Sequence, residues 1–295
     1  MKEERKAARR FGDRYDGRRV RDLDPFFKIM PYVMRTRADA HVYFEDRIDI
    51  GVSSAWLRRL RDQGRPDIGF LHLFVAAIVR TLSQKPRLNR FIAGQKIYAR
   101  NGLSVSLAIK KKLDEDSMET TVKLRFRPED TIFDVADHIN EVVGASKDES
   151  ARNEADKAAG IFNILPGFML RFAVWLLRCL DYLGIMPAPL IDASPFHASA
   201  FVTDLGSLGI KPIYHHIYDF GTISLFVAFG GKERHREPDA DGSPVNRTFI
   251  SMKFVGDERI CDGHYYASAF RYMLDLFKNP GSLERPPEEV RTDLG

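Results

Sequence analysis

The chain has 295 residues, of which 44% are hydrophobic, 11% aromatic and 29% charged, so it can form one large core and is not a long disordered chain. Its two cysteines, Cys179 and Cys261, exclude a disulfide scaffold and favour a reducing, cytoplasmic location. The formal net charge of +4 is already reached within residues 1–22, which contain no apolar stretch typical of a signal peptide. We therefore expect a basic N-terminal arm over residues 1–24 and a nearly neutral body, without the basic and aromatic pattern that predicts nucleic-acid binding.

The first half of the chain mixes strands and helices. Alternating apolar residues predict a strand over residues 41–50, and Ser53 or Ser54 can cap a short helix over residues 55–63. A broad apolar stripe predicts a helix over residues 68–84, which Pro86 ends. The same two periodicities predict the remaining elements of this half, which are strands over residues 104–110 and 120–127 and a helix over residues 131–143.

Residues 161–191 consist mostly of Ile, Leu, Phe, Met and Trp, and we treat residues 158–195 as a hydrophobic insertion. Arg171 lies in the middle of the run and prolines bracket it, which disfavours a transmembrane helix. The favoured interpretation is a hydrophobic helix packed in the core or against a neighbouring subunit. The alternative is an amphipathic helix that binds a membrane surface or an acyl chain.

The last part of the chain is rich in predicted strands. A charged segment over residues 230–247 reads as a loop that joins the second and third of these strands in a long hairpin, and the tail over residues 282–295 is expected to be loose. The predicted elements are strands over residues 198–204, 222–229 and 248–255 and a final helix over residues 263–278. The whole pattern predicts one α+β domain over residues 25–281, with a large mixed β-sheet flanked by helices.

The residues that close the last strand and open the final helix form a motif. Asp257, Arg259, Asp262 and Gly263 match the pattern Asp-His-Arg-x-x-Asp-Gly, and Glu258 stands at the position of the His. This motif resembles the signature of the dihydrolipoyl acyltransferase catalytic domains of 2-oxo acid dehydrogenase complexes, which share their fold with chloramphenicol acetyltransferase. Two segments in the same order add to the resemblance. They are residues 199–210, similar to a strand ending in Ser/Thr-Asn-Leu-Gly, and residues 70–91, similar to a helix followed by a His-Pro-x-Leu-Asn turn.

The resemblance implies a homotrimer, with the possibility of a larger cage, whose active site lies between subunits. There the acyl donor and coenzyme A meet, a His acts as general base, and a Ser or Thr hydroxyl, here Thr203, stabilises the oxyanion. Asp257, Arg259, Asp262 and Gly263 would structure the loop. The related dehydrogenase-complex proteins carry lipoyl and subunit-binding domains before this domain. The sequence suggests a stand-alone catalytic domain, so a lipoyl group would come from another chain and acyl-coenzyme A is an equally open donor.

The Glu at position 258 decides the chemistry. Proton transfer from a thiol with a pKa of about 8.5 to a solvated Glu with a pKa of about 4.3 is uphill by roughly 6 kcal/mol, so Glu258 can act as a base only when it is desolvated. A bond to the neighbouring Arg259 would also keep the carboxylate ionised and weakly basic. His264, one step further, is a possible replacement base.

Other polar residues offer less. The tandem pair His215 and His216 lacks the further ligand that a metal site needs, so no bound metal is expected, and Cys261 is expected to pack in the core. Two hypotheses stay open: a coenzyme-A-dependent acyltransferase with an altered base, carried by Glu258 and Thr203, and a catalytically inactive trimeric or cage-forming scaffold of the same fold.

Overall fold

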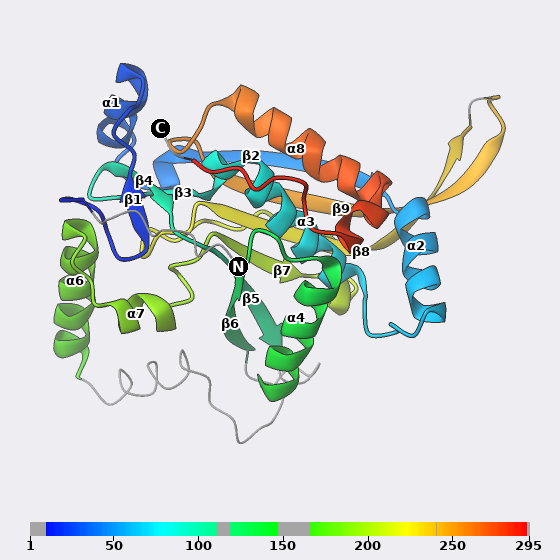
Figure 1. Cartoon of the computed structure of the whole chain (residues 1–295), viewed down its shortest axis with the longest axis horizontal. Coiled ribbons are helices and arrows are strands. Elements are labelled where there is room, and N and C mark those ends of the chain that lie inside the picture. Colours follow the sequence, from blue (N-terminus) through cyan, green and yellow to red (C-terminus); the bar gives the residue numbers. More distant parts are fainter. Residues whose placement is uncertain (1–9, 111–118, 147–165, 240, 294–295) are drawn as a thin grey trace.

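A mixed β-sheet forms the centre of the computed structural model, which describes residues 10–110, 119–146, 166–239 and 241–293. Its strand order is β2-β9-β8-β7-β5-β6, with β5, β7 and β8 parallel to one another and the other pairs antiparallel (Figure 1). The strands are β2 (His41–Asp49), β5 (Leu103–Lys110), β6 (Glu119–Phe126), β7 (Ala200–Asp204), β8 (Leu225–Pro238) and β9 (Pro244–Asp257). The sheet is therefore mixed, as the sequence predicts.

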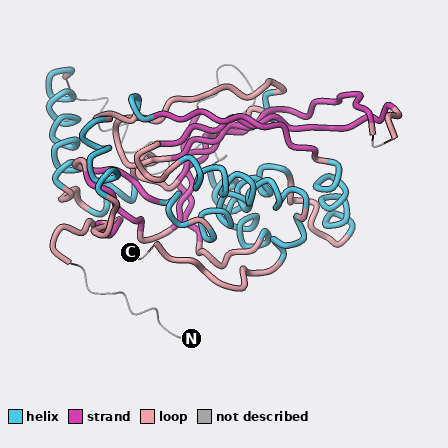
Figure 2. The backbone as a smooth tube through the Cα atoms, turned by 90° about the horizontal axis from the view of Figure 1, so that it is seen from above, coloured by secondary structure: helices cyan, strands magenta, loops and turns pink. Residues whose placement is uncertain are grey.

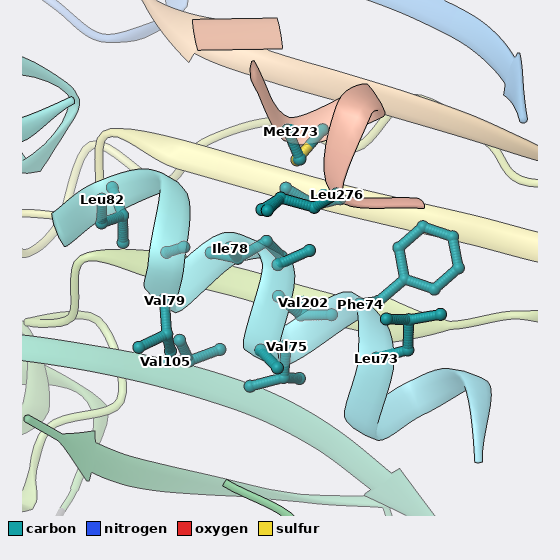
Figure 3. Close-up of a cluster of buried hydrophobic side chains, with 14 of the residues drawn as sticks. Leu73, Phe74, Val75, Ile78, Val79, Leu82, Val105, Val202, Met273 and Leu276 are labelled. Atoms are coloured by element: carbon teal, nitrogen blue, oxygen red, sulfur yellow. The ribbon is translucent and has the colours of Figure 1, made fainter. Parts of the chain in front are cut away.

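Helices cover one face of this sheet, and Figure 2 shows this helical layer on one side of the strands. α3 lies in the middle of the layer, and every residue from His72 to Ser83 is buried. Its Phe74 and Ile78 meet Val202 of the sheet and Leu276 of the final helix (Figure 3). The helices of this part are α2 (Gly51–Asp62), α3 (Phe70–Gln84), α4 (Ile132–Ser146) and α8 (Gly263–Lys278).

Local capping differs from the prediction at the start of α2. The helix begins at Gly51 without a side-chain cap, and Ser53 lies inside it. The buried Ser53 hydroxyl donates a hydrogen bond of 2.7 Å to the carbonyl of Phe277 in α8. Ser53 thus joins two helices instead of capping one, because a tertiary acceptor lies within its reach.

The sequence pattern missed several short elements at one end of the molecule. These are α1 (Pro25–Val33) and a second sheet of order β1-β4-β3, made of β1 (Gly17–Arg19), β3 (Arg90–Ala93) and β4 (Lys96–Arg100). Strands of three to five residues contain too few alternations to be recognised by period. Because β1 pairs with β4, this stretch belongs to the body and is not a free arm.

Residues 230–247 form a two-stranded ribbon, where a charged loop was expected. β8 and β9 stay paired out to Pro238 and Pro244, after a bulge between Phe229 and Lys232, and the ribbon projects from one end of the molecule (Figure 1). Exposed residues fill most of the ribbon, so its strands lack the apolar alternation on which sequence recognition depends.

The C-terminal tail is attached along α3 where a loose segment was expected. Arg291 donates its backbone N–H to the carbonyl of Ser83, and Arg80 donates to the carbonyl of Arg285. The guanidinium of Arg90 holds the carboxylate of Asp293 through two bonds of 2.6 and 2.8 Å. These bonds extend the described body to residue 293.

The hydrophobic insertion contains α6 (Gly167–Leu183) and α7 (Ala188–Ala193), and α6 stands at the same end of the molecule as α1 (Figure 1). Asp181 is the only buried residue of α6. The sequence favoured a helix packed in the core or against a neighbouring subunit; the first placement is wrong, and the second stays a prediction. In the described ranges, no helix is long and apolar enough to cross a bilayer.

Candidate functional site

The turn between β9 and α8 is held by a buried ion pair. The Asp257 carboxylate accepts bonds of 2.8 and 2.7 Å from the Nε and Nη2 atoms of Arg259, and both side chains are almost fully buried. Arg259 also donates to the carbonyl of Met34, and the hydroxyl of Tyr266 donates to the carbonyl of Asp257. The pair therefore ties this turn to α8 and to the end of α1.

Two glycines flank the turn and differ in their steric need. A Cβ at Gly256 would lie 2.7 Å from the Tyr266 hydroxyl, so the tyrosine can pack there only over a glycine. A Cβ at Gly263 would meet nothing within 4 Å, and its φ is not in the left-handed region. The tight passage expected at Gly263 is therefore not a steric requirement. Asp262 begins α8 by accepting the N–H of Tyr265 at 2.8 Å.

Glu258 occupies the outer corner of this turn. Its backbone N–H donates to the carbonyl of Ala40 at 2.8 Å, and its side chain is exposed. In the described part of the chain its carboxylate forms no hydrogen bond or ion pair, because Arg259 is bonded to Asp257. Glu258 therefore does not pair with Arg259. In the single chain, however, Glu258 also lacks the burial that a Glu base requires.

Thr203 lies near the end of β7, next to a tight turn. The side chain is almost buried, and its hydroxyl has no hydrogen-bond partner among the described residues. Asp204 follows it and accepts the N–H of Ser207 at 3.1 Å, and burial raises the pKa of this carboxyl above its usual value. A Cβ at Gly206 would lie 2.7 Å from the carbonyl of Gly230, so this turn needs glycine for its close approach to β8.

The strand register keeps Glu258 and Thr203 apart within one chain. Thr203 is level with Ala228 of β8, which pairs with Lys253 of β9. Asp257 lies four residues further along β9, which is about 13 Å at the usual rise of a strand. Two strand spacings of about 4.8 Å separate β7 from β9 in addition. The two residues therefore cannot act on one acyl group within a single chain.

The other sequence candidates are placed apart from one another. His264 is exposed in the first turn of α8. Cys261 is buried, and burial raises the pKa of its thiol far above the ordinary value, so it is an unreactive packing residue. His215 stacks on Phe226 at 4.5 Å, whereas His216 contacts Tyr218. No group of three His, Cys, Asp or Glu residues that could hold a metal occurs in the described segments.

His41 is a neighbour of the turn that sequence reasoning did not single out. It begins β2 as the ladder partner of Asp257, so it lies beside Glu258. Its Nε2 accepts the N–H of Ile217 at 3.2 Å, which assigns the proton to Nδ1, 3.1 Å from the Tyr43 hydroxyl. Burial lowers its pKa, so the imidazole is neutral. His41 is brought to the turn by the pairing of β2 with β9, and no local sequence motif reveals that pairing.

Thr203 and His41 share the sheet face opposite the helices. Alternation places Thr203 with Phe201 on this outer face, while Val202 points to the core. On the same face Lys253 is paired with Glu45, and its ammonium lies 4.3 Å from the ring centre of Tyr214. A line of polar and aromatic side chains thus crosses the outer face between the two ends of the candidate site.

A polar cleft of about 480 Å³ opens near the start of α8. Tyr265 of α8 and Lys85 at the end of α3 line it together with the attached C-terminal segment over residues 289–292. The cleft carries the cationic side chains of Lys85 and Arg291 and the acidic Glu289. It is the larger of the two described hollows, and its lining is suited to a polar ligand.

Comparisons with solved structures confirm the predicted fold. A probable dihydrolipoamide acetyltransferase from Listeria monocytogenes matches 89% of this chain and 95% of its own, with a TM-score of 0.58 and 14% identity. The cubic core of the pyruvate dehydrogenase multienzyme complex matches 90% and 93%, with a TM-score of 0.57 and 12% identity. A chloramphenicol acetyltransferase matches 88% and 99%, with a TM-score of 0.56 and 10% identity.

No protein-family model matches the chain, and no curated protein sequence is similar to it. The likeness to known proteins is therefore a likeness of fold. This chain has the chloramphenicol-acetyltransferase-like α+β fold, as the three sequence segments predict.

Proposed function

We propose that this chain is an acyltransferase that moves an acyl group to or from coenzyme A, with Thr203 as the oxyanion donor and Glu258 at the position of the base. The observation that carries the proposal is the buried Asp257–Arg259 pair, which holds the turn of an acyltransferase-like fold and leaves Glu258 exposed at its corner. Thr203 supports it, because its hydroxyl is free to donate to a developing oxyanion.

The active site would form between two copies of the chain. Glu258 and Thr203 are far apart in one chain, so a site that uses both needs Glu258 of one copy and Thr203 of another. A second copy would also remove Glu258 from water, and a Glu base requires this desolvation. A homotrimer or a cage built from trimers has this arrangement.

Turnover assays test the proposal directly. Acetyl-coenzyme A and longer acyl-coenzyme A thioesters are given, together with dihydrolipoamide as the thiol that accepts the acyl group, to the wild type, to Glu258→Gln, to Glu258→His and to Thr203→Val, and the free coenzyme A that leaves is measured. We expect activity in the wild type, a fall of at least about 100-fold in Thr203→Val and a similar fall in Glu258→Gln. Equal rates in wild type and Thr203→Val would remove Thr203 from the mechanism.

Subunit mixing tests whether the site is shared. Inactive Glu258→Gln and Thr203→Val chains are expressed together, so that mixed oligomers contain sites with both residues intact. We expect the mixture to recover part of the wild-type rate, whereas each variant alone stays inactive. A mixture that stays inactive, although light scattering shows mixed oligomers, contradicts a site between copies.

A second candidate is a catalytically inactive scaffold of the same fold. One observation favours it: Glu258 is exposed and lacks the burial that would make it a base. This candidate predicts a stable oligomer without turnover of any acyl thioester by the wild type. Activity that appears only in Glu258→His would support it, because that outcome shows a competent fold from which the base has been lost.

A further inference from the structure

One face of α6 is a strongly exposed apolar surface. At about 100° per residue, five large side chains fall within one sector of roughly 100° on this helix. Phe168 is 74% exposed, Phe172 61% and Trp175 57%, so more than half of each aromatic side chain is open to solvent. The α6 face, as we name it, consists of Phe168, Phe172, Trp175, Leu176 and Leu183.

The helix is firmly attached at its C-terminal end, so its orientation is fixed. Asp181 is held by the buried guanidinium of Arg14 at 2.6 Å, and Arg14 also donates to the carbonyl of the same residue. Tyr182 donates its hydroxyl to Gln95 at 2.9 Å. A Cβ at Gly94 would lie 2.2 Å from the carbonyl of Tyr182, so the turn between β3 and β4 approaches the helix as closely as glycine allows.

Charge near the α6 face is positive. Arg171 and Arg178 are two helical turns apart and lie along one flank of the face. Neither forms an ion pair with any described residue, whereas the two acidic residues of the insertion are both neutralised by arginines. These acidic residues are Asp181, paired with Arg14, and Asp192, paired with Arg125.

The basic start of the chain is anchored at the same helix. The bond from Arg14 to Asp181 places the first described residues beside α6. The sequence that precedes them has more basic than acidic residues, namely Lys2, Arg5, Lys6 and Arg9 against Glu3 and Glu4. The sequence thus joins net positive charge to a segment whose Arg14 is bonded to α6, and no other part of the described chain covers the α6 face.

We propose that α6 docks this protein on an anionic lipid surface, with the α6 face inserted at the level of the headgroups and Arg171 and Arg178 bound to lipid phosphates. Interfacial helices combine an apolar face that contains Trp, Phe and Leu with flanking cations. If the α6 faces of two copies packed against each other about a twofold axis, Arg171 and Arg178 of both copies would come together without acidic partners. Anionic headgroups supply the complementary charge that the described chain lacks.

Vesicle flotation tests this proposal without measuring catalysis. The full chain is mixed with two kinds of vesicle. One is phosphatidylcholine alone, and the other is phosphatidylcholine with about a third of the anionic lipid phosphatidylglycerol. We expect flotation with the anionic vesicles and about 30-fold weaker partitioning in the double variant Arg171→Gln and Arg178→Gln, since each surface cation contributes about a fivefold factor. The double variant Phe172→Ser and Trp175→Ser should stay in the soluble fraction.

A matched control removes exposed apolar residues from other elements. Val52 in α2 and Val245 in the β-ribbon are exposed, and Figure 1 places both elements at the end opposite α6. Val52→Ser and Val245→Ser together should float like the wild type. Equal flotation of the α6 variant and the wild type would overturn the proposal, and so would wild type that never floats.

Tryptophan fluorescence gives a second readout. The chain has two tryptophans, and Trp56 is buried and bonded to Glu284, so Trp175 alone is exposed to a bilayer. Lipids brominated in the upper acyl chain should quench the wild type but quench Trp175→Phe much less. If light scattering instead shows that Phe172→Ser with Trp175→Ser splits an oligomer, and no lipid quenching occurs, a second copy covers α6 and the proposal is wrong.

Discussion

The turn after β9 exposes a polar side chain and the helical insertion exposes apolar ones, but a buried ion pair holds both regions in place. In the turn, the buried Asp257–Arg259 pair leaves the polar Glu258 exposed at a corner. In the insertion, the buried Arg14–Asp181 pair holds one end of α6 while its aromatic residues are exposed. Buried ion pairs thus position the exposed groups in both regions, although they differ in whether the presented surface is polar or apolar.

The comparison teaches that exposure here is not a sign of loose structure. A buried ion pair contributes little net stability, but removing one partner leaves an unpaired buried charge. In each region the buried ion pair therefore fixes the backbone conformation that exposes these side chains. Substitutions that break the anchors should be costly, while substitutions at the presented residues should barely affect folding.

The largest expected effect is at the anchor of the turn. Asp257→Ala leaves the Arg259 guanidinium buried without a partner and should lower the free energy of unfolding by about 3–5 kcal/mol. Urea unfolding measures this loss. Glu258→Gln is the matched control at the next residue and should stay within about 0.5 kcal/mol of the wild type. A loss below 1 kcal/mol in Asp257→Ala would show that the pair does not anchor the turn.

The two glycines that flank the turn sharpen the comparison further. Gly256→Ala forces a Cβ into the hydroxyl of Tyr266 at 2.7 Å and should cost about 1–3 kcal/mol. Gly263→Ala meets open space at the first residue of α8 and should gain a few tenths to about 1 kcal/mol. Thermal unfolding distinguishes them, and a stabilising Gly256→Ala would contradict the packing of Tyr266.

Acid should weaken the anchor of the insertion. Burial alone would raise the pKa of Asp181, but the His197 imidazole, whose Nε2 lies 3.4 Å from the carboxylate, and the charge and hydrogen bond of Arg14 bring it down to about 2 from an ordinary 3.8. The unfolded chain then binds the proton first as pH falls, so about 2 kcal/mol of stability is present above pH 5 and is lost between about pH 5 and pH 2.

Urea unfolding at several pH values in this window measures the loss. The stability difference between wild type and Asp181→Asn should shrink as the pH falls, because protonated Asp181 resembles the amide. The variant Asp62→Asn, on α2, serves as a control and should follow the wild type. A difference that stays constant down to pH 2.5 would show that the ionised Asp181 does not anchor α6.

The smallest effect is expected at Thr203. Its hydroxyl has no hydrogen-bond partner in the described chain, and valine has the same shape, so Thr203→Val should change the free energy of unfolding by less than about 0.5 kcal/mol. Thermal unfolding and the thioester assay are run on the same preparation. A large loss of stability would reveal a structural role for Thr203. A loss of activity in Thr203→Val would then no longer be evidence that Thr203 takes part in the reaction.

The sequence alone determined the class of the fold and its main elements. The strands β2, β5, β6 and β7 and the helices α3, α4 and α8 were recognised from the sequence, because their apolar residues recur at periods of two or of 3.6 residues. The motif from Asp257 to Gly263 also pointed to the fold. The ion pair that holds this turn joins residues two positions apart, so it can be recognised in a short stretch of sequence. Short strands and the charged ribbon lacked such a period and were missed.

Only the tertiary structure decided the roles at the surface. Whether Arg259 bonds to Glu258 or to Asp257 depends on which carboxylate is buried with it, and neighbouring residues cannot show that. The distance between Glu258 and Thr203 is set by the register of β7, β8 and β9, which joins residues far apart in the chain. The exposure of α6 depends on a long-range bond that Asp181 accepts from Arg14 and on one that Tyr182 donates to Gln95, so an apolar sequence by itself could not distinguish a core helix from an exposed one.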